Sequence, residues 1–143
     1  GEVLGLLHNE IQHRRVVVTT SLCAPAPTVF ADRVQLQQVL LNLIVNACDA
    51  MSDTPTDERL LVVSTSSNGE PRIEVSDRGS GFAPNALTSV FEPFVTTKRD
   101  GLGLGLAICR SIITAHRGRM WAVNNQDRGA TLVVALPLAT EER

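Results

Sequence analysis

Polar side chains lie along one face of a helix that the sequence predicts over residues 32–51. They are three or four residues apart, as one helix face requires. The members of this stripe are Gln35, Gln38, Asn42, Asn46 and Asp49. Short amides on an otherwise apolar helix can bind the polar groups of a ligand, and no Lys, Arg or Glu occurs between residues 34 and 51. The stripe therefore indicates a face covered by a polar ligand, with an ordinary solvated helix face as the alternative.

A carboxylate and two glycines follow a predicted strand over residues 72–76. Asp77 stands at the strand end, and Gly79 and Gly81 follow it at alternate positions. The glycines let the backbone turn tightly beside a flat ligand, and the carboxylate lies at the edge of the sheet. A plain turn is the alternative, because Asp and Gly are both common turn formers.

Alternating glycines open a second predicted helix, over residues 104–116. Gly101, Gly103 and Gly105 let backbone N–H groups approach a phosphate, and the helix dipole favours its negative charge. A dinucleotide-binding fold needs such glycines directly after a strand, but residues 96–100 do not predict one. A Walker A loop is excluded because no Gly-Lys-Ser/Thr follows. The cluster therefore predicts phosphate binding at a helix N-terminus.

The other elements are predicted from periodicity and turn residues. They are a helix over residues 2–14, a short helix near 86–90, and strands over 16–22, 28–30, 60–66, 72–76, 119–123 and 130–136. Asp32 stands where the N-cap of the long helix belongs. Because strands and helices are mixed without regular alternation, we expect an α/β sandwich with the helices on one face of a mixed sheet.

Composition limits the class of protein. The chain of 143 residues fits one domain, and its net charge of −2 gives no reason to expect nucleic acid or an anionic membrane as a partner. The longest apolar run, over residues 39–45, is interrupted by Asn42 and is too short to span a bilayer. Three separate cysteines without a CxxC predict buried free thiols in a reducing compartment, so we expect a cytoplasmic domain. These are Cys23, Cys48 and Cys109.

Taken in order, the motifs resemble those of the histidine-kinase ATPase family, which also contains gyrase, Hsp90 and MutL. The resemblance is carried by LQQVLLNLIVNACDAM at 36–51, DRGSG at 77–81, FEPFVTTK at 91–98, GLGLG at 101–105 and GAT at 129–131. It extends over nearly the whole chain, from about Val16 to Pro137. It implies the Bergerat ATP-binding fold, a two-layer α/β sandwich with a mixed, mostly antiparallel sheet. It also implies ATP and Mg²⁺ as ligands, and phosphoryl transfer to a protein histidine as the reaction.

The resemblance assigns roles to single residues. Asn46 would ligate Mg²⁺, and Asp77 would accept a hydrogen bond from the adenine amino group. Gyrase-like hydrolases carry a water-activating Glu at the position of Asn42, whose amide cannot act as a general base, so transfer is favoured over hydrolysis. The full set of expected nucleotide-binding residues is Asn42, Asn46, Asp49, Asp77, Gly79, Gly81, Phe82, Lys98, Gly101, Leu102, Gly103, Leu104, Gly105, Leu106 and Thr131.

The chain departs from the commonest family pattern at two places. Asp49 stands where many histidine kinases carry a Lys that meets phosphate, and this acidic version resembles oxygen-sensing and nitrogen-regulating sensor kinases. Lys98 or Arg99, in the predicted lid over ATP, can take the place of that Lys, with a solvated charge pair as the alternative. Arg117 replaces the first glycine of the common His-Gly-Gly, which should affect a turn and not the chemistry.

The resemblance also predicts the organisation of a larger protein. Residues 1–15 would be a lead-in helix from an absent dimerisation domain, 16–138 the ATP-binding domain and 139–143 a polar tail. The substrate histidine would lie on the dimerisation domain of a homodimer that passes the phosphoryl group to the receiver domain of a response regulator. We expect no contact of this part with nucleic acid or membrane, although absent segments can anchor the full-length protein. The alternatives are an ATP-sensing module without transfer and a hydrolase of the gyrase or Hsp90 type.

Overall fold

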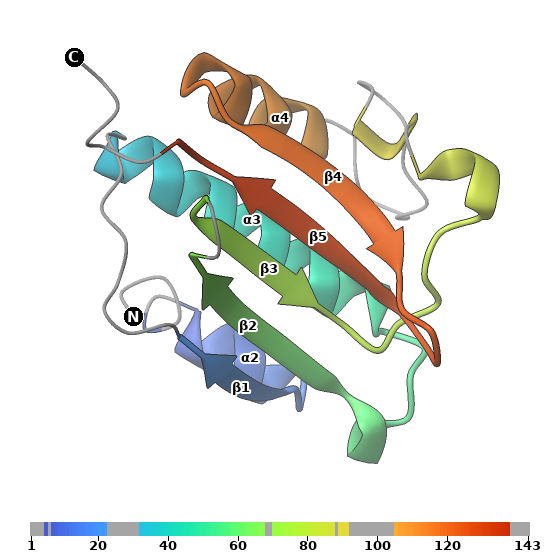
Figure 1. Cartoon of the computed structure of the whole chain (residues 1–143). Coiled ribbons are helices and arrows are strands. Elements are labelled where there is room, and N and C mark those ends of the chain that lie inside the picture. The colour runs from blue at the N-terminus through green and yellow to red at the C-terminus, as the bar shows by residue number, and fades with distance from the viewer. Residues whose placement is uncertain are drawn as a thin grey trace.

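A computed structural model of the chain describes residues 5, 7–22, 32–67, 70–87, 89–91 and 105–137. Among these residues, five strands form one sheet in the order β1-β2-β3-β5-β4 (Figure 1). The strands are β1 (Val17–Ser21), β2 (Leu60–Ser66), β3 (Arg72–Ser76), β4 (Arg119–Asn124) and β5 (Ala130–Ala135). Only β1 and β2 run parallel, and the other pairs are antiparallel. The predicted mixed, mostly antiparallel sheet is confirmed.

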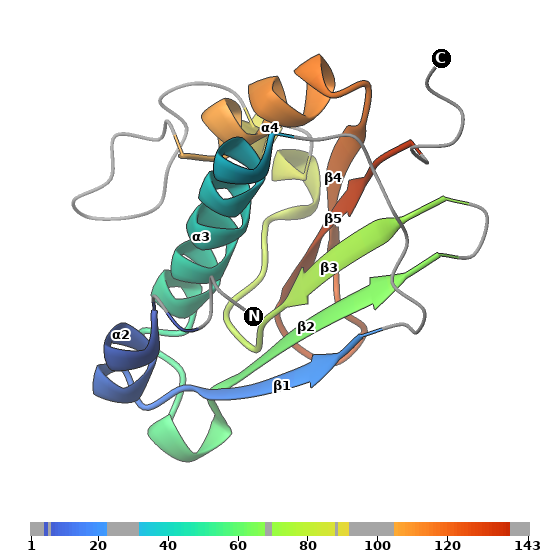
Figure 2. The same cartoon turned by 90° about the vertical axis from the view of Figure 1, so that its left-hand side faces the viewer.

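Within the described part of the chain, three helices cover one face of this sheet, which we call the inner face (Figures 1 and 2). They are α2 (His8–His13), α3 (Arg33–Ala50) and α4 (Gly105–Ala115). The core between the two layers contains side chains that are almost completely buried, among them Leu43 of α3, Leu61 of β2 and Ile113 of α4. The predicted two-layer arrangement is therefore confirmed. Among the described residues, no helix is both long and apolar enough to cross a bilayer.

Alternation along the strands defines the opposite, outer face. Leu61, Val63 and Val75 pack into the core between sheet and helices. Because successive strand residues point to opposite faces, their neighbours Val62 and Ser76 point outward. This distinction decides which of the predicted site residues can share a pocket.

Helix α3 begins where the sequence predicts. The Asp32 side chain accepts a hydrogen bond from the Gln35 N–H at 3.0 Å, as an N-cap does. The Asp32 N–H in turn donates to Nε2 of His116 at 3.0 Å, while His116 Nδ1 donates to the Ile112 carbonyl at 2.8 Å. The imidazole thus joins the start of α3 to the end of α4.

Other local predictions have mixed outcomes. Cys48 and Cys109 are buried thiols that form no disulfide with a described residue, as expected, and burial raises the pKa of Cys48 to about 11. Near the short helix predicted at 86–90, the described residues form two 3₁₀ helices in place of an α-helix, Pro84–Ala86 and Ser89–Phe91. Segments this short do not recover the entropy of nucleating an α-helix. Cys23 and the strand predicted over residues 28–30 lie outside the described residues.

Helix α4 ends in a Schellman motif with an arginine in the position that favours glycine. The Gly118 N–H donates to the Ile113 carbonyl and the Arg117 N–H to the Thr114 carbonyl. Arg117 adopts the left-handed conformation, with φ of 64°. The departure from the family's His-Gly-Gly therefore affects a turn, as predicted.

Replacing Arg117 with Gly is expected to stabilise the domain by about 0.5–1 kcal/mol, because glycine adopts this conformation without the steric penalty of a side chain. Urea unfolding would show a higher midpoint with an unchanged slope. The control is Arg117→Ala, which removes the same side chain but keeps a Cβ and should give no such gain. Equal stabilisation by both variants would contradict the backbone explanation.

Candidate nucleotide-binding site

Asp77 is a buried carboxylate at the end of β3. Its Oδ1 accepts hydrogen bonds from the backbone N–H of Gly79 at 2.8 Å and of Ala130 at 3.3 Å. Burial raises the pKa of this carboxyl despite the opposing effect of the two N–H groups. No described residue donates a hydrogen bond to its other oxygen, Oδ2. The free oxygen can therefore accept a hydrogen bond from a ligand.

Two glycines bring the loop after β3 against its neighbours. A Cβ on Gly79 would lie 2.4 Å from the carbonyl oxygen of Ala50, so only glycine allows the loop to touch the last residue of α3. Gly129, at the start of β5, has φ of +85°, and a Cβ there would lie 2.1 Å from the Asp77 carbonyl oxygen. The Asp77 loop is thus packed directly between the end of α3 and the β4–β5 turn.

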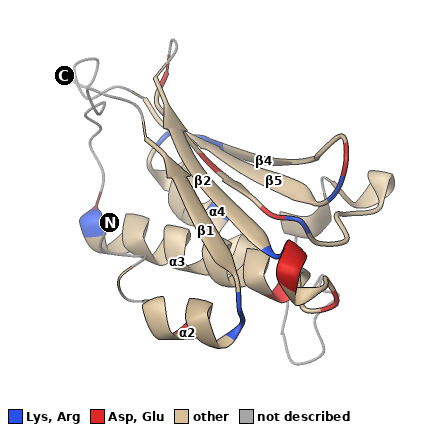
Figure 3. Ribbon diagram, turned by 90° about the horizontal axis from the view of Figure 1, so that it is seen from below, with Lys and Arg blue, Asp and Glu red and all other residues tan. Residues whose placement is uncertain are grey.

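The asparagines of the polar stripe lie on the side of α3 that meets this loop. Asn42, Asn46 and Ala50 are each four residues apart and share one helix face, and Ala50 is the residue that Gly79 contacts. Both asparagines are partly buried, and neither uses its side-chain amide in a hydrogen bond with another described residue. Figure 3 shows that α3 carries hardly any charge between its first and last turns. The two asparagines therefore lie on the helix face that the Asp77 loop contacts at Ala50, and no described residue uses their side-chain amides.

Asp49 is engaged by a cation from a different helix. Its Oδ1 lies 2.6 Å from Nη1 of Arg14, whose Nε lies 2.7 Å from the Glu10 carboxylate of α2. The acid that stands in place of the family's lysine is thus balanced by Arg14. A contact of Asp49 with nucleotide stays a prediction, and any such ligand would compete with this ion pair.

The side chain of Thr131 points to the other face of the sheet from the one expected for a nucleotide-binding residue. It pairs with Ser76 across the sheet, and its hydroxyl lies 3.0 Å from Ser76 Oγ and donates to Oδ1 of Asn125 at 2.6 Å. These groups lie on the outer face, whereas the Asp77 carboxylate is on the inner side, next in alternation to Ser76. The backbone N–H that meets the carboxylate belongs to Ala130. The Thr131 hydroxyl therefore faces away from the position expected for the adenine.

The remaining predicted residues are only partly described. Gly105 is the exposed first residue of α4, and Leu106 and Phe82 pack against the core. Phe91, the first residue of the FEPFVTTK motif at 91–98, is buried. The Arg110 guanidinium lies over its ring, 5.1 Å from the ring centroid. The others lie outside the described residues: Lys98, Gly101, Leu102, Gly103 and Leu104.

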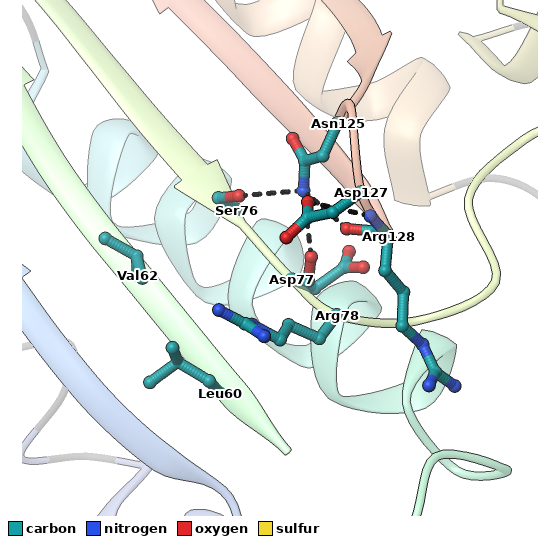
Figure 4. Close-up of a pocket in the computed structure, with 8 residues that line it drawn as sticks. All are labelled: Leu60, Val62, Ser76, Asp77, Arg78, Asn125, Asp127 and Arg128. Atoms are coloured by element: carbon teal, nitrogen blue, oxygen red, sulfur yellow. Dashed lines mark hydrogen bonds between the residues drawn. The ribbon is translucent and has the colours of Figure 1, made fainter. Parts of the chain in front are cut away.

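A pocket of about 170 Å³ opens on the outer face of the sheet, beyond the ends of β3 and β4 (Figure 4). Its lining residues are Leu60, Val62, Ser76, Asp77, Arg78, Asn125, Asp127 and Arg128. Val62 and Ser76 are outward-pointing residues, so this pocket and the free amides of α3 are on opposite sides of the sheet. The pocket is not the place where the predicted nucleotide residues meet.

Two residues at this end of the sheet were missed by sequence reasoning. Asn124 and Asn125 hold the backbone of the Asp77 loop through their side-chain amides. In the sequence they precede Gln-Asp-Arg-Gly and are indistinguishable from ordinary turn residues. Only the fold shows what they contact.

The comparison with known families agrees with this geometry. Residues 31–140 match the family described as histidine kinase-, DNA gyrase B- and HSP90-like ATPase. The chain belongs to this family. It is 45% identical over 130 residues to the sensor protein FixL of Bradyrhizobium diazoefficiens. This alignment covers 91% of the chain and 26% of FixL. It is 36% identical to the C4-dicarboxylate transport sensor protein DctS of Rhodobacter capsulatus, over 98% of the chain and 22% of DctS.

Solved structures of this ATPase family share the fold. The catalytic domain of histidine kinase ThkA superposes with a TM-score of 0.85 at 30% identity, over 99% of the chain and 91% of that domain. Full-length ShkA in complex with AMPPNP matches with a TM-score of 0.82 at 31% identity, over 96% of the chain and 29% of ShkA. The chain thus has the ATPase fold of histidine kinase catalytic domains, as the motifs predicted. It spans about a quarter of the named relatives it matches.

Proposed function

We propose that this domain binds Mg-ATP between α3 and the Asp77 loop and presents the γ-phosphoryl group to a histidine on a separate dimerisation domain. The observation that supports it is the pairing of a free carboxylate oxygen on Asp77 with two free amides, Asn42 and Asn46, on the helix face that the loop touches. Asp77 would then bind the base at one part of this surface, and Asn46 would bind the metal ion at another. ATP needs two such places because its base and its phosphates lie at opposite ends of the molecule.

The residues present fit these ligands. The Oδ2 of Asp77 can accept a hydrogen bond from the adenine amino group. Asn46 offers a neutral amide oxygen, which suits a hard cation such as Mg²⁺ that keeps most of its waters and is already neutralised by triphosphate. When bound, Mg²⁺ would offset the charge of the phosphates during transfer. The glycines at 101, 103 and 105 would surround the phosphates, which stays a prediction for all three.

The mechanism that follows is positional. Asn42 occupies the position from which a general base would activate water, and an amide cannot take up that proton at neutral pH. The domain would therefore hold the nucleotide and leave the attack to the incoming imidazole nitrogen, which displaces ADP from the γ-phosphorus in line. Without that acceptor, turnover should be slow.

The partners follow from the same proposal. We infer that residues 1–15 lead in from a dimerisation domain, that 16–138 form the ATP-binding domain and 139–143 a polar tail, and that the full-length protein is a homodimer. Leu7, from the lead-in segment, is buried in the core of the domain, so this segment is tied to it. A response regulator is the acceptor of the next step. ThkA, a structural neighbour at 28% identity and a TM-score of 0.82, has been solved in complex with the response regulator protein TrrA.

The test is phosphotransfer to a separately supplied dimerisation domain of the full-length protein, with γ-labelled ATP. We expect an acid-labile label on that domain, dependent on Mg²⁺, and little phosphate release without it. Asn46→Ala should reduce transfer at least roughly ten- to a hundredfold, the effect of losing a residue that only supports a metal ligand. The control is Gln38→Ala, an exposed amide of the same stripe, which should transfer normally. Binding without transfer would favour a sensing module, and rapid acceptor-free phosphate release would favour a hydrolase.

A further inference from the structure

The side-chain amide of Asn124 forms two hydrogen bonds with the backbone of one residue in the Asp77 loop, as the backbone of a neighbouring strand would. Its Oδ1 accepts a hydrogen bond from the Phe82 N–H at 2.9 Å, and its Nδ2 donates to the Phe82 carbonyl at 2.7 Å. Asn124 is the last residue of β4, so its amide continues the pairing beyond the point where the strand ends. Only a primary amide carries a donor and an acceptor close enough to bind both groups of one residue.

Gly81 makes room for this contact. It has φ of +75°, and a Cβ at this position would lie 2.9 Å from Oδ1 of Asn124. The second glycine of the Asp-x-Gly-x-Gly motif is therefore required for the approach of the Asn124 amide as well as for the turn. The motif and Asn124, which lie more than forty residues apart, form one structural unit.

Asn125 holds the other end of the same loop (Figure 4). Its Nδ2 lies within hydrogen-bond distance of three acceptors, the Asp77 carbonyl at 3.0 Å, the Arg128 carbonyl at 3.0 Å and Ser76 Oγ at 3.2 Å. Its Oδ1 accepts from the Thr131 hydroxyl at 2.6 Å. The amide is thus fixed from several sides and in turn fixes the backbone of the residue whose carboxylate faces the ligand.

We infer that Asn124 and Asn125 are positioning residues that hold the loop 77–82 in the conformation that reads the nucleotide base, an inference that rests on the proposed function. The loop contains Gly79 and Gly81, which have more conformational freedom than other residues. Hydrogen bonds at its two ends restrict that freedom before the ligand arrives, so less affinity is lost to ordering on binding. We expect the pair to act on base recognition and not on phosphate binding, because its hydrogen bonds to the loop are made to the backbone of Asp77 and Phe82.

The test compares a ligand that has the base with one that lacks it. Mg-ATP and Mg-tripolyphosphate are titrated calorimetrically into the wild type, Asn124→Ala, Asn124→Asp and Asn125→Ala. We expect ATP affinity to fall about tenfold in each variant, as the loss of one or two hydrogen bonds predicts, while tripolyphosphate affinity stays within twofold. Asn124→Asp is isosteric and keeps the acceptor for the Phe82 N–H, so it provides a folded variant if Asn124→Ala unfolds. The control is Asn85→Ala, an exposed asparagine of the 84–86 turn, which should change neither affinity.

Amide hydrogen exchange supplies the second readout. The inference expects faster exchange over residues 77–82 in the Asn124 variants, with unchanged protection of the core strands β3 and β5. Unchanged ATP affinity and unchanged exchange would overturn it. So would a parallel fall in affinity for both ligands, which indicates a general loss of structure. A wild-type domain that binds neither ligand would instead refute the proposed function, and the exchange measurement would still decide whether the two asparagines order the loop.

Discussion

Replacing Asp77 with Asn is expected to weaken Mg-ATP binding roughly ten- to a hundredfold without lowering the melting temperature. The affinity falls because a charge-assisted hydrogen bond to the base, worth about 1.5–3 kcal/mol, becomes a poorly matched amide contact. The fold is not weakened, because burial raises the pKa of this carboxyl and so disfavours its charged form in the folded state. The amide oxygen of Asn can still accept the hydrogen bond from Gly79.

The sign of the pH dependence follows from that shift. A carboxyl with a raised folded-state pKa destabilises the fold once the pH exceeds its unfolded value, and this penalty disappears in acid, where both states are protonated. Asp77→Asn should therefore be at least as stable as the wild type at neutral pH, and the difference should shrink as the pH falls. ATP affinity of the wild type should decrease over the same range, because protonation removes the charged acceptor.

Calorimetric titration and thermal unfolding of the same samples check both parts. The matched control is Asp127→Asn, an exposed carboxylate in the β4–β5 turn whose Oδ1 accepts a hydrogen bond from the Arg128 N–H. It makes the same change of charge at the same end of the sheet and should leave ATP affinity unaltered. Equal losses in the two variants would point to a general electrostatic effect, and an unaltered Asp77→Asn affinity would remove Asp77 from the site.

The parts of this site that are local in sequence could be predicted. Helix α3 follows from Asp32 as a cap and from periodic apolar residues, and its stripe of amides depends only on helix geometry. The Asp77 loop follows from a strand end and two glycines. In each case the interactions that determine the structure join residues a few positions apart, so they can be inferred from the sequence alone.

The parts of the site that depend on tertiary contacts could not be predicted, for physical reasons. Strand β5 is buried along its whole length, so it shows no apolar-polar alternation that would reveal which way Thr131 points. Asn124 and Asn125 act on residues more than forty positions away, through pairings that depend on strand order. The ion pair between Arg14 and Asp49 likewise joins two helices whose packing is tertiary. Long-range register decides all three.

Replacing Gly129 with Ala is expected to destabilise the domain by about 3 kcal/mol or more, because two effects act together. The residue has a left-handed backbone at φ of +85°, and a Cβ would lie 2.1 Å from the Asp77 carbonyl oxygen and 2.7 Å from its carbonyl carbon. Neither atom belongs to a flexible side chain. Relief therefore requires β3 and the β4–β5 turn to separate, which breaks the hydrogen bonds that hold the Asp77 loop.

Gly105 differs from Gly129, because Gly129 is required by packing whereas Gly105 is expected to serve phosphate binding. A Cβ on Gly105 would meet no atom of a described residue within 4 Å, so Gly105→Ala should keep or slightly raise stability, since Ala favours the helix by up to about 1 kcal/mol. If the glycines before α4 bind phosphate through their backbone, the same variant should bind Mg-ATP more weakly while remaining folded. Urea unfolding and ATP titration of both variants show whether each glycine is needed for stability or for ATP binding. A stable Gly129→Ala would show that the turn can rearrange, and an unstable Gly105→Ala would show that its glycine is structural.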